Sequence, residues 1–92
     1  PVIAVPLSVS PLGGLDALYA MVQMPRGIPV ATVAVDGAFN AGILAAQIIG
    51  VKDPLVRERI IAYKKELANQ VKEKNERLQK LGYKKYIAGA EK

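Results

Sequence analysis

Residues 2–7 read Val-Ile-Ala-Val-Pro-Leu, and residues 29–35 read Pro-Val-Ala-Thr-Val-Ala-Val. Neither run alternates polar with apolar residues. Such runs are typical of strands that are covered on both faces, as in a parallel sheet. The two stretches therefore predict a pair of buried parallel strands.

A helix is predicted between the two strands, because apolar residues recur there at the spacing i, i+3, i+4 and i+7. Pro25 is expected to end this helix at Met24. Strand, helix and strand form a βαβ crossover, which is expected to be right-handed. The apolar positions are Leu15, Leu18, Tyr19 and Val22.

A second helix is predicted over residues 41–49, with Asn40 as its cap and Gly50 at its end. Because this helix is apolar nearly all round, we expect it to be buried between other elements.

A long charged helix is predicted after it. Asp53 and Pro54 are the residue types of a cap and a first helical position, and Gly82 is expected to end the helix. Residues 83–92 are then expected to form a loosely held tail. Lys74 interrupts the apolar stripe of the helix, which consists of Val56, Ile60, Tyr63, Leu67, Val71, Leu78 and Leu81.

The composition excludes several classes of site. The 92 residues include no cysteine and no histidine, which excludes disulfides and thiolate metal sites and removes the commonest general acid/base. No apolar run approaches the roughly 20 residues of a membrane span. We expect one small cytoplasmic domain without a membrane partner.

Charge is concentrated in the second part of the chain. Residues 1–50 carry one arginine and two aspartates, a net of −1, whereas residues 51–92 carry twelve Lys or Arg and six Asp or Glu, a net of +6. Acids and bases alternate at i,i+4, which favours a solvated helical face over a nucleic-acid-binding face. The pairs are Asp53–Arg57, Glu73–Arg77 and Glu76–Lys80.

Two parallel strands cannot form a stable sheet by themselves, because their edges need pairing and both faces need cover. The chain also opens with Pro1 directly before a strand. We therefore expect a piece of a larger α/β domain, whose missing strands come from an upstream segment, another chain or both.

The most distinctive stretch is residues 22–32, Val-Gln-Met-Pro-Arg-Gly-Ile-Pro-Val-Ala-Thr, preceded by Gly-Leu-Asp-Ala-Leu at residues 14–18. With these motifs, Pro1 to Ile49 resembles the C-terminal half of the PurE family, the class I mutases acting on N5-carboxyaminoimidazole ribonucleotide. The short turn at residues 35–40 is similar to that of archaeal-type members. The remaining matching stretches are residues 2–6, Ser10, Leu12, Asn40, Ala41 and residues 44–48.

The resemblance implies a three-layer αβα, flavodoxin-like fold and a homo-octamer. Residues 1–50 would be the C-terminal half of the domain, residues 51–82 a helix that packs on a neighbouring subunit, and residues 83–92 a tail.

The resemblance also implies the chemistry of purine biosynthesis: a carboxylate moves from N5 of the aminoimidazole ribonucleotide to C4, by decarboxylation and recarboxylation, without metal or organic cofactor. The family's catalytic histidine and phosphate-holding residues belong to the other half, so we assign no catalytic residue here. The partners implied are the substrate and the upstream half of the domain.

Two segments are candidates for lying next to the substrate. Ser8, Ser10, Gly13 and Gly14 follow the first strand, at the sheet edge where ligands bind in this fold. The alternative is ordinary capping, with Ser10 as N-cap and Pro11 at the first helical position.

The second candidate is the turn that contains Gln23, Met24, Pro25 and Gly27. It would shape the active-site wall or a subunit contact, or it simply connects a helix to a strand.

For three further polar residues, a structural role is favoured over a catalytic or ligand-binding one. Asp16 suits the first turn of its helix or an intersubunit hydrogen bond better than a catalytic acid. Asn40 suits a cap better than a ligand, and Tyr63 suits core or interface packing.

The leading hypothesis is therefore that this chain is part of the mutase, which is an isomerase. The alternatives are a carboxylase that uses free carbon dioxide, and a non-catalytic interaction module of the same fold.

Overall fold

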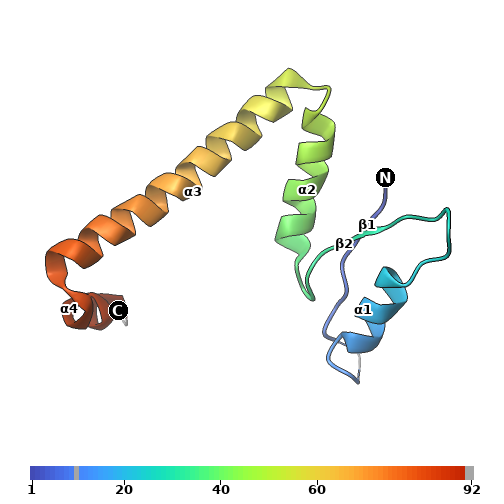
Figure 1. The fold of residues 1–92 in the computed structure, drawn as a ribbon, viewed down its shortest axis with the longest axis horizontal. Coiled ribbons are helices and arrows are strands. Elements are labelled where there is room, and N and C mark those ends of the chain that lie inside the picture. Colours follow the sequence, from blue (N-terminus) through green and yellow to red (C-terminus); the bar gives the residue numbers. More distant parts are fainter. Residues whose placement is uncertain (10, 91–92) are drawn as a thin grey trace. The chain divides into compact units, whose positions relative to one another are not determined.

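The computed structural model describes residues 1–9 and 11–90, in the order β1 (Ile3–Ala4), α1 (Leu15–Val22), β2 (Ala31–Thr32), α2 (Ala38–Gly50), α3 (Pro54–Leu81) and α4 (Tyr83–Ala90). The chain divides into two units, residues 1–57 and residues 58–92. The order of the elements can be followed in Figure 1. No helix in the described part of the chain is long and apolar enough to cross a membrane.

Strands β1 and β2 pair in parallel, as predicted, with Ile3 opposite Ala31 and Ala4 opposite Thr32. Both strands are shorter than the apolar runs suggested. Hydrogen bonds nevertheless continue along the pair, from the Ala31 N–H to the Val2 carbonyl at 2.9 Å and from the Val33 N–H to the Ala4 carbonyl at 3.2 Å.

Helix α1 contacts β2, and helix α2 contacts β1. The two helices lie on opposite sides of the strand pair (Figure 1), so this unit has the α/β layering that the sequence predicted. The Thr32 hydroxyl donates to the Met21 carbonyl at 3.3 Å and ties the end of α1 to β2.

The capping interpretation placed the first helical position of α1 at Pro11, and this was wrong. The helix begins at Leu15, and Gly14, with φ 93°, is the residue before it. Pro11 therefore lies in a turn ahead of the helix, and Ser10 lies outside the described residues. The helix ends at Val22, two residues before the predicted Met24, because Gln23 leaves the helical conformation and the Met24 N–H donates to the Val22 carbonyl at 3.1 Å and not to a carbonyl four residues earlier.

The predicted cap of α2 was also wrong. Asn40 lies inside the first turn, because the helix already begins at Ala38 and the Ala41 N–H donates to the Gly37 carbonyl at 3.0 Å. Gly50 is the last residue of α2 and is buried. A Cβ there would lie 3.3 Å from the Arg57 backbone, so glycine permits the close approach of the next helix.

Both predicted ends of α3 are confirmed. One carboxylate oxygen of Asp53 accepts the N–H groups of Leu55 and Val56 at 3.0 and 3.2 Å, which is an N-cap. Gly82 follows the last residue of the helix and has φ 77°, the left-handed conformation that commonly ends helices.

The side chain of Arg57 has partners that the sequence did not predict. Its guanidinium donates to the Gly50 and Val51 carbonyls at 2.8 and 2.9 Å, at the end of α2. The carbonyls left unpaired at a helix end are thereby satisfied.

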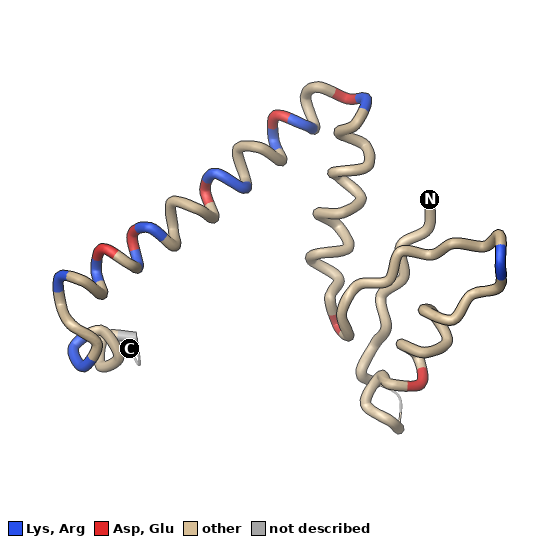
Figure 2. The backbone as a smooth tube through the Cα atoms, in the orientation of Figure 1, with Lys and Arg blue, Asp and Glu red and all other residues tan. Residues whose placement is uncertain are grey.

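Charged residues lie mainly along α3 (Figure 2). In the second unit, the Arg77 guanidinium lies 5.7 Å from the centre of the Tyr86 ring, within cation–π range. Helix α4 occupies Tyr83–Ala90, where the sequence suggested a loose tail.

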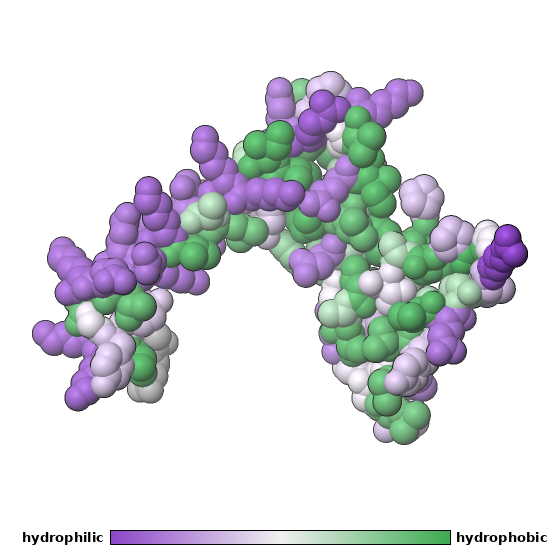
Figure 3. Space-filling view, viewed as in Figure 1, coloured by the Kyte–Doolittle hydropathy of each residue, from purple (hydrophilic) through white to green (hydrophobic). Residues whose placement is uncertain are grey.

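The described residues do not enclose a hydrophobic core. Of the residues whose side chains are described, Pro6, Gly14 and Gly50 are buried. Hydrophobic surface covers much of α2 and the strand pair (Figure 3), and α2 is half-exposed rather than buried as predicted. Leaving a large apolar side chain in water forfeits about 1.5–3 kcal/mol, so these faces are suited to cover by further polypeptide.

Candidate functional site

The carboxyl ends of β1 and β2 meet at one edge of the strand pair, which we call the C-terminal edge. The β1–α1 loop, of which the structure describes residues 7–9 and 11–14, leaves the sheet there, and Asp36 follows β2 at the same edge. Open α/β sheets bind ligands outside the carboxyl ends of their strands. This edge is therefore the candidate site.

Asp36 joins the two strand ends. Its N–H donates to the Pro6 carbonyl at 2.8 Å, and its carboxylate oxygen accepts the Ser8 N–H at 3.0 Å. Asp36 has φ 60°, a left-handed conformation that aspartate tolerates better than most residues. The turn thereby directs the carboxylate of Asp36 to a residue 28 positions earlier in the chain.

The charge of Asp36 is stabilised by the same neighbour. Hydrogen bonds from the side chain and the backbone N–H of Ser8 lower the pKa of Asp36 below its ordinary value of 3.8. Hydrogen bonds to the ionised form favour that form. Asp36 is thus a fixed, exposed anion at the C-terminal edge at neutral pH.

Gly14 closes the other end of the loop. It is buried, and a Cβ there would lie 2.8 Å from Cγ1 of Val35 and 3.1 Å from the Leu7 carbonyl oxygen. Gly13 also has a positive φ, 65°, but no described residue lies within 4 Å of a Cβ there. Of these two glycines, Gly14 is therefore the one that close packing requires.

Ser8, Gly13 and Gly14, all predicted as candidates, thus share the β1–α1 loop, while Ser10 falls outside the described residues. The structure adds Asp36, which the sequence reading had treated only as part of a turn. Its position directly after an apolar strand, before a glycine, was the available signal.

The second candidate segment lies elsewhere. Residues 23–28 connect α1 to the start of β2 at the opposite, N-terminal edge of the strand pair (Figure 1). The structure therefore does not bring Gln23, Met24, Pro25 and Gly27 together with the β1–α1 loop of the same chain.

Local hydrogen bonds shape this second segment. The Ile28 N–H donates to the Pro25 carbonyl at 3.0 Å, and Gly27 has φ 92°, which is the geometry of a type II turn. The Met24 N–H donates to the Val22 carbonyl at 3.1 Å. The backbone of residues 23–28 is therefore accounted for by a turn that simply connects a helix to a strand.

The remaining sequence candidates have structural positions. Asp16 lies in the first turn of α1, where its charge complements the helix dipole. Tyr63 lies half-exposed on α3. In the described part of the chain, no group of three or more His, Cys, Asp or Glu side chains is arranged to hold a metal ion.

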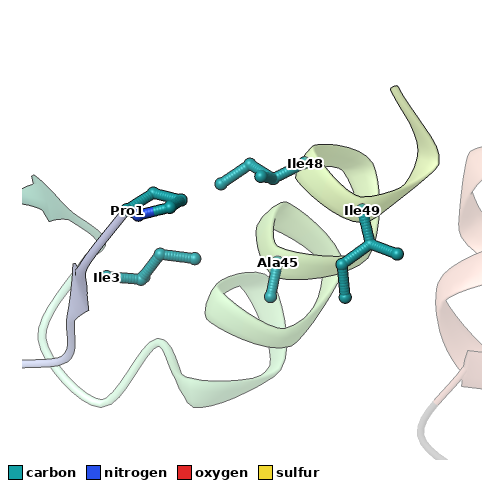
Figure 4. A pocket seen from close by; sticks show the side chains of 5 residues that line it. All are labelled: Pro1, Ile3, Ala45, Ile48 and Ile49. Carbon is teal, nitrogen blue, oxygen red and sulfur yellow. The ribbon is translucent and has the colours of Figure 1, made fainter. Parts of the chain in front are cut away.

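An apolar hollow of ≈ 200 Å³ lies between the start of β1 and the end of α2. Ile3 and Ile48 point toward one another across it, beside Pro1 (Figure 4). Ala45 and Ile49 complete its lining, and Ile49 is 56% exposed. Such a hollow offers hydrophobic contact and no polar chemistry.

Comparison with known proteins identifies the kind of domain to which these elements belong. The family model described as AIR carboxylase matches residues 1–70. The chain belongs to the AIR carboxylase family.

Two relatives of this family are named N5-carboxyaminoimidazole ribonucleotide mutase. The protein from Thermotoga maritima is 52% identical over 87 residues, covering 95% of this chain and 51% of the relative. The protein from Pyrococcus horikoshii is 48% identical over 88 residues, covering 96% of this chain and 50% of the relative.

A third relative has another name. The chloroplastic phosphoribosylaminoimidazole carboxylase of Vigna aconitifolia is 44% identical over 87 residues, covering 95% of this chain and 16% of the relative. The chain spans about half the length of the two mutases.

Proposed function

We propose that this chain supplies one half of a mutase domain that converts N5-carboxyaminoimidazole ribonucleotide to 4-carboxy-5-aminoimidazole ribonucleotide in purine biosynthesis. The observation that carries the proposal is the 52% identity over 87 residues to the Thermotoga maritima mutase. Identity at this level over nearly the whole chain supports a shared fold and shared chemistry.

The open apolar faces support a missing half. Phe39 and Ile49 of α2 are 69% and 56% exposed, and hydrophobic surface of this kind marks a contact with further polypeptide. The missing half would pair the free strand edge, complete a flavodoxin-like αβα domain with residues 1–50, and cover the hollow of Figure 4.

This chain's part in the chemistry would be binding and positioning. It has no histidine, so the imidazole that manages the proton at C4 would come from the other half. Ser8, Gly13 and Gly14 would lie next to the ribonucleotide, because their loop leaves the C-terminal edge of the sheet.

The turn with Gln23, Met24, Pro25 and Gly27 would have a different role. Since it lies at the N-terminal edge, it would reach a substrate only in a neighbouring copy, where it would form a wall of that copy's site or a subunit contact.

The assembly is part of the proposal. Residues 51–82 would pack on a neighbouring subunit and residues 83–92 would be the tail that follows, within a cytoplasmic homo-octamer. Light scattering of the assembled protein and cell fractionation test these two properties.

The test of the activity is reconstitution. This chain is co-expressed with the part of the Thermotoga maritima mutase that it does not match, giving what we call the reconstituted domain. Conversion of the N5-carboxylated to the C4-carboxylated nucleotide is then followed by absorbance. We expect turnover that neither part shows alone. An assembled, folded complex without turnover would contradict the proposal.

The carboxylase activity is a second candidate, favoured by the name of the Vigna aconitifolia relative. Supplying the uncarboxylated ribonucleotide with bicarbonate or carbon dioxide separates the two reactions. Faster product formation from carbon dioxide than from the N5-carboxylated nucleotide would favour the carboxylase.

A further inference from the structure

The β1–α1 loop is attached at both ends to two consecutive residues that follow β2. At its start, Ser8 donates its N–H to the Asp36 carboxylate at 3.0 Å. At its end, Gly14 packs so closely on Val35 that a Cβ would lie 2.8 Å from that side chain. The two ends of the loop are thus both held by the segment that follows β2.

We propose that Asp36 is a positioning residue, which holds the start of the β1–α1 loop in the conformation that receives the ribonucleotide. The inference rests on the proposed function, since it assigns a role within that site.

Asp36 is suited to this role because it makes two hydrogen bonds, one as a donor and one as an acceptor. Its backbone N–H donates to Pro6, the last residue before the loop, and its carboxylate accepts from Ser8, the second residue of the loop. Leu7 lies between the two attachment points. A strand end held at two points separated by one residue has little freedom to pivot.

The side chain is specific for the task. A carboxylate is a stronger acceptor for an N–H than a neutral oxygen. Among residues with an acceptor side chain, aspartate and asparagine are the ones that adopt a φ of 60° readily. The backbone conformation and the acceptor are therefore satisfied together at this position.

Ser8 is engaged in this arrangement rather than free. Its N–H donates to the Asp36 carboxylate at 3.0 Å, and hydrogen bonding from Ser8 lowers the pKa of the Asp36 carboxyl. The loop's contribution to binding a ribonucleotide would then come from the residues that follow, whose location Ser8 and Asp36 fix.

The experiment compares Asp36→Gly and Asp36→Asn in the reconstituted domain. Glycine accepts the φ of 60° but has no acceptor, whereas asparagine keeps both the φ and one acceptor oxygen. Thr32→Val is the matched control, since it removes a hydrogen bond between α1 and β2 that does not involve the loop. For each complex of equal purity, KM and kcat for the N5-carboxylated nucleotide are measured, with hydrogen exchange of the Ser8 amide.

We expect Asp36→Gly to raise KM by about tenfold, because it removes one hydrogen bond to a charged group. The kcat should change by less than about threefold. Asp36→Asn is expected to lie between wild type and Asp36→Gly. The Ser8 amide should exchange faster in Asp36→Gly, and Thr32→Val should leave both readouts unchanged.

A KM in Asp36→Gly equal to that of wild type would overturn the inference while the proposed function stands. Failure of Asp36→Gly to assemble would overturn it too, because Asp36 would then act on the fold. A wild-type complex without turnover would instead overturn the proposed function, and the inference with it.

Discussion

The two edges of the strand pair are built on different principles. At the C-terminal edge, contacts join residues far apart in the chain: Ser8 to Asp36, and Gly14 to Val35. At the N-terminal edge, the turn of residues 23–28 is closed by hydrogen bonds between residues two to four positions apart. A loop held by distant residues is sensitive to its neighbours, whereas a local turn depends on its own backbone. The following predictions test this difference.

The largest effect is expected from Gly14→Ala at the C-terminal edge. Alanine would be strained at φ 93°, and its methyl group would lie 2.8 Å from the Val35 side chain. Left-handed strain and overpacking together should lower the free energy of unfolding of the reconstituted domain by about 3 kcal/mol. Denaturant titration measures the loss, and an unchanged midpoint would contradict the packing described for Gly14.

Gly27→Ala at the N-terminal edge is the matched comparison. Gly27 has φ 92°, almost the value of Gly14, but no atom of the described chain lies within 4 Å of a Cβ there. Only the strain remains, so the expected loss is about 1 kcal/mol. Equal losses of stability in Gly14→Ala and Gly27→Ala would contradict the claim that packing by distant residues distinguishes the two edges.

Thr32→Val should have a smaller effect. It removes the hydrogen bond from the Thr32 hydroxyl to the Met21 carbonyl but keeps the shape of the side chain. The expected loss is about 0.5–1 kcal/mol. Thr32→Ser is the control, since it keeps the hydroxyl that donates to Met21 and loses only the methyl group.

The smallest effect concerns the charge of Asp36. Because its pKa is lowered in the folded protein, the stabilisation is fully present above its ordinary pKa of 3.8 and is lost as the pH falls through the lowered value. The difference in denaturant midpoint between wild type and Asp36→Asn should therefore be present at pH 7 and close below pH 3.8. A difference that persisted in acid would show that the Asp36 charge is not its source.

Local signals in the sequence predicted the elements well. The continuous apolar runs indicated two parallel strands, and Asp53, Pro54 and Gly82 correctly bounded the long helix, because caps act through their own neighbours in the chain. The family was likewise identifiable from residues 22–32, and the match over residues 1–70 confirms it.

The errors occur where distant contacts decide the structure. Ser10 and Pro11 have the residue types of a helix start, but α1 begins only after Gly14, which packs against Val35. Similarly, the hydrogen bond between Ser8 and Asp36 spans 28 positions and leaves no local pattern. The burial of α2 was overestimated. An apolar sequence indicates that a helix is to be covered, but it does not indicate which polypeptide covers it.

The central claim is that this chain forms only part of a hydrophobic core. Thermal and chemical unfolding of the isolated 92-residue polypeptide, followed by circular dichroism and calorimetry, tests it most directly. We predict no cooperative transition for the chain alone and a cooperative one for the reconstituted domain. A monomer that melts in a single sharp, cooperative transition without any partner would contradict the account.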